Sequence, residues 1–97
     1  MQLFRQGDVL LKRIDGMPTG AKKTDDSVLA RGEATGHSHR IEGGRVFRTG
    51  NGQLLVQVEE EAKLVHEEHR QITIPQGTYE VVRQVEYNPI AERQVSD

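Results

Sequence analysis

The four histidines of this sequence fall into two short motifs. His37 and His39 are two residues apart in "GHSHRI", and His66 and His69 are three apart in "VHEEH". Neutral imidazole is a good ligand for Zn, Fe, Ni, Cu or Co ions, and a carboxylate can fill a further position. The two motifs therefore predict one divalent transition-metal site, held by His37, His39, His66 and His69.

The spacing of each pair limits how its members can converge. Side chains two residues apart on a strand point to the same face, about 7 Å apart along the backbone, so His37 and His39 can approach one ion. A spacing of three suits a helical turn, or a strand end where the chain curls. In a strictly extended "VHEEH", His66 alone of its pair would join the site. Glu42 and Glu67 are the candidate carboxylate ligands.

A plainer interpretation is that both motifs are solvated polar segments. Arg40 and Arg70 adjoin them, and a cation beside a metal ion is unfavourable. "HEEH" is one residue shorter than the zinc-protease motif HExxH, so a hydrolytic zinc enzyme is not predicted. The sequence has no cysteine nucleophile, GxSxG, P-loop or GxGxxG motif. We therefore assign no catalytic residue, and enzymatic activity is left open.

Composition predicts one small domain, spanning residues 1–97. Hydrophobic residues make up 34% of the chain, aromatic residues 4%, and cysteine is absent. Such a chain builds a thin aliphatic core, which often needs a metal or a partner subunit for stability. Because disulfides are excluded, we expect a homo-oligomer, metal binding, or both.

Charge and hydropathy exclude other classes. The formal net charge is −2, and proteins that bind nucleic acids usually carry a basic excess, so nucleic acid is not an expected partner. No apolar run is long enough to cross a membrane. The start, "MQLFRQGD", does not resemble a signal peptide, so we expect the cytoplasm.

The elements that must position the histidines read as an all-β fold, a small barrel or sandwich. Apolar runs such as "DVLLKRI" alternate with glycine-rich turns at 43–44 and 50–52, which is typical of an antiparallel meander. Residues 15–27 are predicted to be a mobile loop, and residues 89–97 a polar tail. The alternative for residues 58–70 is one short helix, because Glu, Ala, Lys and Leu favour helices.

Two partial resemblances to known families arise. His37-x-His39-x-x-Glu42 resembles the first cupin motif and Pro75-x-Gly77 the start of the second, which implies a β-barrel holding a metal with three histidines and a glutamate. Glu80 stands where cupins place their last histidine. "GDVLLKRI" resembles the opening of GroES-type co-chaperonin subunits, which implies a partial barrel.

A third resemblance spans most of the chain. The pattern GEATGHSHRI…VHEEH…IPQGTYEVVRQ is similar to that of small uncharacterised bacterial and phage proteins. It implies no function. The sequence therefore predicts a small metal-binding β-barrel protein with a histidine-lined site. The alternative is a non-catalytic oligomeric assembly module with a GroES-like partial barrel and no metal.

Overall fold

The computed structural model describes residues 2–32 and 36–83, and within them every regular element is a strand. The predicted all-β class is confirmed. The eight strands, in chain order, are β1 (Leu3–Gln6), β2 (Val9–Ile14), β3 (Lys22–Thr24), β4 (Val28–Arg31), β5 (Ser38–Glu42), β6 (Arg45–Arg48), β7 (Leu54–Val65) and β8 (Ile72–Arg83).

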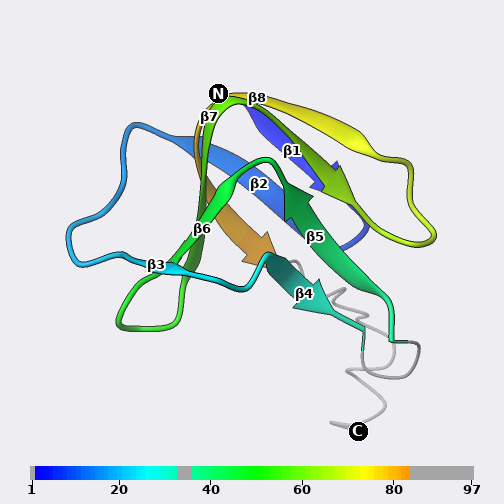
Figure 1. The fold of residues 1–97 in the computed structure, drawn as a ribbon, viewed down its shortest axis with the longest axis horizontal. Coiled ribbons are helices and arrows are strands. Elements are labelled where there is room, and N and C mark those ends of the chain that lie inside the picture. Colours follow the sequence, from blue (N-terminus) through cyan, green and yellow to red (C-terminus); the bar gives the residue numbers. More distant parts are fainter. Residues whose placement is uncertain (1, 33–35, 84–97) are drawn as a thin grey trace, which may run out of the picture.

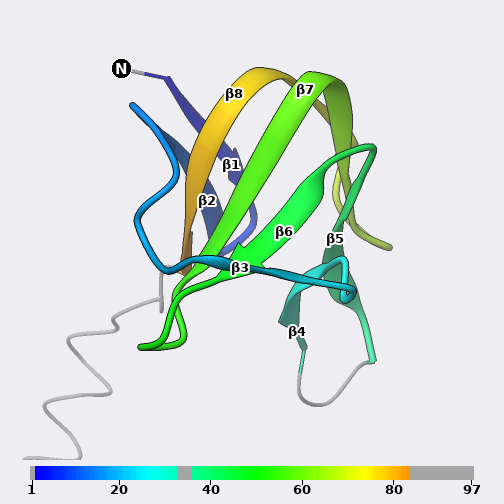
Figure 2. The same ribbon diagram turned by 60° about the vertical axis from the view of Figure 1, so that its left-hand side comes forward.

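These strands form one curled antiparallel sheet that makes a half-barrel. The main order is β1-β2-β8-β7-β5-β4, and β6 pairs both with β7 and with β3. The two long strands β7 and β8 arch over the molecule, and the shorter strands continue the curl from either side (Figures 1 and 2). The first half of β7 pairs with β6 and its second half with β5.

The curl is sharpest where β7 and β8 lose their regular register. The pairing shifts between Val58 and Glu61 on β7, opposite Pro75 and Gly77 on β8. Proline cannot donate a hydrogen bond to the ladder, so within a sheet it is tolerated at such irregularities. Pro75, Gln76 and Gly77 therefore lie inside strand β8.

The core is thin and mostly aliphatic. Its fully buried side chains come mainly from β2, β7 and β8, and the largest is Tyr79. The Tyr79 hydroxyl donates a hydrogen bond to the Pro75 carbonyl at 2.7 Å, and its ring meets Phe4 edge-on at 5.9 Å. Burial raises the pKa of the Tyr79 hydroxyl.

The short helix considered for residues 58–70 is wrong. Residues up to Val65 belong to β7, and the chain then bends without forming a helix. Val56 and Val58 are buried before the register shift and Ala62 and Leu64 after it, which is the two-residue period of a strand. Burial of this face against the sheet overrides the local helix propensity.

Two further segments bear on the sequence predictions. The predicted loop at 15–27 contains the three-residue strand β3, which pairs with β6. The predicted tail at 89–97 lies outside the described residues. No helix in the described ranges is long and apolar enough to cross a membrane.

Candidate metal centre

The structure brings the four histidines together at one end of the half-barrel. His37 immediately precedes β5, His39 lies on β5, and His66 and His69 lie in the β7–β8 connection. The ring centroid of His66 is 4.3 Å from that of His39, 4.6 Å from that of His69 and 5.6 Å from that of His37. The chain curls directly after Val65, so both members of the second pair reach the cluster.

Two overlapping sets of side chains have the spacing that an ion requires. The ligand atoms of His39, His66 and His69 all lie within 4.8 Å of one another. Those of His37, His66 and Glu67 satisfy the same limit. In the first set His39 is buried, His66 is half-buried and His69 is exposed, so that set has one protected side and one side open to solvent.

A cavity of about 220 Å³ opens over the cluster. All four histidines line it, together with four charged side chains: Asp8, Arg31, Glu68 and Arg83. The site therefore has a concave, polar space above the imidazoles in which a ligand could sit.

Gln6 fixes the orientation and the tautomer of His39. This buried side chain donates from Nε2 to the carbonyls of Leu64 at 3.0 Å and Arg70 at 2.9 Å. Two carbonyls at one end of an amide require the NH2 group there, so Oε1 must face His39 Nδ1, 2.9 Å away. That oxygen can only accept, so His39 carries its proton on Nδ1. Its Nε2 is left with a lone pair that faces the cluster.

The bare Nε2 of His39 faces a carboxylate. It lies 3.3 Å from Asp8 Oδ1, while Asp8 Oδ2 accepts a hydrogen bond from Arg83 Nε at 3.0 Å. Burial, and then the neighbouring His66, lower the pKa of His39 despite the nearby Asp8. The lowered pKa and the contact with Gln6 both favour the neutral ring with its proton on Nδ1. In that form the lone pair of Nε2 faces the carboxylate at 3.3 Å.

The pKa of Asp8 reflects the same arrangement. Burial by itself raises the pKa of this carboxyl group, but the hydrogen bond from Arg83, a backbone hydrogen bond and the charge of Arg83 outweigh it. The pKa is therefore lowered, and Asp8 is a carboxylate at neutral pH.

His66 is also held neutral, but with the opposite tautomer. Burial, and then His69, lower its pKa. Its Nδ1 accepts a hydrogen bond from the Glu68 backbone N–H at 3.0 Å, so the proton of the neutral ring is on Nε2. To bind a metal through Nε2, His66 would have to move its proton from Nε2 to Nδ1. It would then lose the hydrogen bond from the Glu68 backbone N–H.

Glu67 serves mainly to hold the two histidine segments together. Its Oε1 accepts from the Ser38 backbone N–H at 2.9 Å and its Oε2 from Arg40 Nη1 at 2.7 Å. The hydrogen bond from Ser38 is the main reason that the pKa of Glu67 falls to about 2. Both carboxylate oxygens of Glu67 thus already accept hydrogen bonds, one of them from the cationic Arg40. Glu67 is therefore a weaker ligand candidate than His39, His66 and His69.

The remaining predicted residues are placed differently. Glu42 ends β5, exposed and paired in register with Lys63, three residues beyond His39. His37 Nδ1 lies 3.5 Å from Glu68 Oε2 on the rim of the cavity. His37 therefore lines the cavity together with the other three histidines, whereas Glu42 is not part of the cavity lining.

Three residues of the site come from the end of β1 and the β1–β2 turn, which the histidine motifs do not indicate. They are Gln6, Gly7 and Asp8. Gly7 has a positive φ of 59°, and a Cβ there would lie 2.8 Å from His69 Nε2 and 3.2 Å from His39 Cε1. Glycine is thus required both for the turn and for the approach of the imidazoles. A Gly-Asp pair is a common turn signal, but nothing in the sequence shows what this turn contacts.

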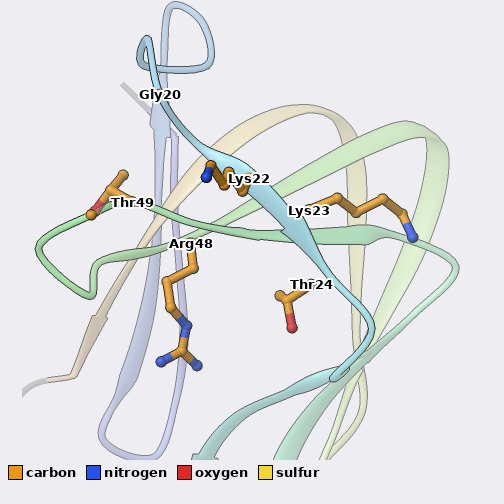
Figure 3. Close-up of a pocket in the computed structure, with 7 residues that line it drawn as sticks. Gly20, Lys22, Lys23, Thr24, Arg48 and Thr49 are labelled. Atoms are coloured by element: carbon orange, nitrogen blue, oxygen red, sulfur yellow. The ribbon is translucent and has the colours of Figure 1, made fainter.

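A second cavity lies on another part of the molecule and has different chemistry. It has a volume of about 410 Å³ and lies beside β3 and the end of β6, lined by Lys22, Lys23 and Arg48 among others. Figure 3 shows that these basic side chains diverge, with Lys23 pointing away from Arg48. They do not converge on one point as the histidines do, so the smaller cavity is the better candidate site.

Comparison with known proteins identifies the family. A domain of unknown function, DUF8820, matches residues 5–84. The chain belongs to this family. The match agrees with the expected likeness to uncharacterised proteins, whereas the cupin and co-chaperonin resemblances stay predictions. No curated protein and no solved structure gives a significant match.

Proposed function

We propose that this protein binds one divalent transition-metal ion at His39, His66 and His69, with Asp8 as the adjacent carboxylate. The observation that carries the proposal is the opposition of His39 Nε2 and Asp8 Oδ1 at 3.3 Å. Gln6 places the proton on the far side of the His39 ring, and burial disfavours a second proton. A cation between the two atoms would relieve the opposition of their lone pairs.

The distance itself agrees with shared coordination. Zinc bonds to histidine nitrogen and carboxylate oxygen are both about 2.0–2.2 Å, so two ligands at a tetrahedral angle lie roughly 3.3–3.5 Å apart. The set of three neutral imidazoles and one carboxylate suits Zn, Fe(II), Ni or Co. Gln6 then has the role of the outer hydrogen-bond partner that orients a metal-bound histidine.

The change of tautomer that His66 needs in order to bind a metal costs little free energy. Releasing its hydrogen bond from Glu68 costs about 1 kcal/mol, the net value of an ordinary protein hydrogen bond. A cost of this size weakens binding by about fivefold and does not abolish it.

Calorimetry on protein purified without a histidine tag tests the proposal. We expect about one Zn²⁺, Ni²⁺, Co²⁺ or Fe²⁺ per chain with a Kd below about 100 μM. His39→Ala should abolish saturable binding, whereas Glu42→Ala, which removes an exposed carboxylate on the same strand, should leave it unchanged. Binding that is absent in the wild type, or equal in both variants, would refute the proposal.

A further inference from the structure

The cavity above the histidines has a charge balance that a bound metal would upset. Its charged lining consists of two acidic side chains, Asp8 and Glu68, and two basic ones, Arg31 and Arg83. These formal charges cancel. Histidines coordinate metal ions as neutral imidazoles, so a divalent ion would leave an excess of about two positive charges in a partly enclosed space. Buried or partly buried charges need a compensating partner.

Arg83 is placed to supply hydrogen bonds to such a partner. Its Nε donates to Asp8 Oδ2 at 3.0 Å and its Nη2 to the Arg31 carbonyl at 3.2 Å. Within residues 2–32 and 36–83 these are the hydrogen bonds of its guanidinium, which has five N–H donors. Asp8 and Arg31 thus fix the group at the cavity wall, and its three other donors make no hydrogen bond to the described part of the chain.

The size of the cavity limits the ligand. A volume of about 220 Å³ corresponds to roughly seven water molecules at about 30 Å³ each. A carboxylate or phosphate group fits this space. A planar guanidinium is also well suited to bind either oxyanion through two parallel hydrogen bonds.

We propose that the site binds a small oxyanion, a carboxylate or a phosphate, between the metal and Arg83. This inference rests on the proposed metal-binding function. It adds a class of ligand to that function. The negative charge of the oxyanion would lie between the metal and the Arg83 guanidinium. The ligand would enter from the exposed side of the site, near His69. Arg31, on the same lining, is paired with Asp26 at 3.1 Å and is two-thirds exposed, so its charge contributes less than that of Arg83.

Titration of the cobalt-loaded protein with anions tests the inference. Cobalt(II) visible absorption reports changes in the metal's ligands, and sodium acetate and inorganic phosphate serve as separate probes at constant ionic strength. We expect at least one probe to change the spectrum saturably. The probe that binds more tightly tells a carboxylate ligand from a phosphate ligand.

Arginine variants give the decisive comparison. Arg83→Gln should weaken binding of the preferred anion about tenfold or more, since a hydrogen bond to a charged group is being removed. Arg31→Gln should weaken it less. Arg45→Gln is the matched control, because Arg45 is as exposed as Arg83, at 51% against 50%, and is likewise paired with a carboxylate, that of Glu59. It should bind the anion as the wild type does.

The outcomes separate this inference from the proposed function. Cobalt binding with no response to either anion would overturn the inference and leave metal binding intact. An Arg83→Gln protein that keeps the wild-type affinities for cobalt and for the anion would also overturn the inference. A wild type that binds no cobalt would overturn both. Melting curves of each variant establish that the folded protein is being compared, and Arg83→Lys, which keeps the charge, should recover part of the anion affinity.

Discussion

Gln6 offers the sharpest test of how the fold prepares the metal site. It has two separable roles: its amide NH2 group ties down two carbonyls, of Leu64 and Arg70, and its amide oxygen orients His39. Gln6→Leu removes both roles. Gln6→Glu removes the two donors but keeps an acceptor for His39 Nδ1. Both variants should therefore lose stability, Gln6→Glu the more because it also buries a carboxylate beside two carbonyl oxygens, and the two should differ in metal affinity.

The magnitudes follow from the contacts. Gln6 has 3% of its surface exposed, and a buried carbonyl that loses its donor costs about 1–3 kcal/mol. With one buried and one partly buried carbonyl, we expect Gln6→Leu to lose about 2–4 kcal/mol of unfolding free energy and Gln6→Glu to lose at least as much. Removing an outer partner of a metal-bound histidine typically costs 10–100-fold in affinity, which we expect for Gln6→Leu alone.

Urea denaturation gives the stability change, and calorimetry with zinc gives the affinity. Gln76→Leu, at an exposed position of β8, controls for the change from an amide to an apolar side chain and should alter neither quantity much. Equal zinc affinities for Gln6→Leu and Gln6→Glu would refute the orienting role. Full stability in Gln6→Leu would refute the tie between the β1–β2 turn and the β7–β8 connection.

Three further predictions concern the turn, pH and assembly. Gly7→Ala should weaken metal binding, because the new methyl group collides with His69 Nε2 and the backbone has a positive φ. Calorimetry measures the change in affinity. Gly20→Ala, at a positive φ with open space around it, is the control for backbone strain. The free energy of unfolding without metal should fall as pH drops below about 6.5, since the folded-state pKa values of His39 and His66 are lowered and the unfolded chain takes up protons first. Denaturation curves from pH 8 to pH 5 test this, and a constant value in the double variant His39→Gln, His66→Gln would confirm the source. We also propose that the chain forms a homo-oligomer, because β1 and β4 end the sheet path and Leu3 on β1 is 55% exposed; light scattering showing a monomer at high concentration would contradict it.

The local pattern of residues determined the class of fold and the kind of chemistry. Apolar residues at a two-residue period and glycines at the turns specify strands wherever they occur, so the all-β sheet was predictable. The histidine motifs likewise indicate imidazole ligands, because ligand chemistry depends on residue type. The same local view was wrong about a helix at 58–70, where strong helix formers such as Glu60 and Lys63 lie in a strand whose other face is buried.

The tertiary structure alone decided how the site is assembled. Gln6 and Asp8 are separated from His39 by some thirty residues of sequence and meet it through the order of strands in the sheet. A sequence pattern contains no information on which turn lies against which strand end, so neither residue could be assigned. The tautomer of His39 and the pairing of Glu67 with Ser38 depend on the same long-range contacts. Residue type thus sets which chemistry is available, and the curl of the sheet sets which side chains share it.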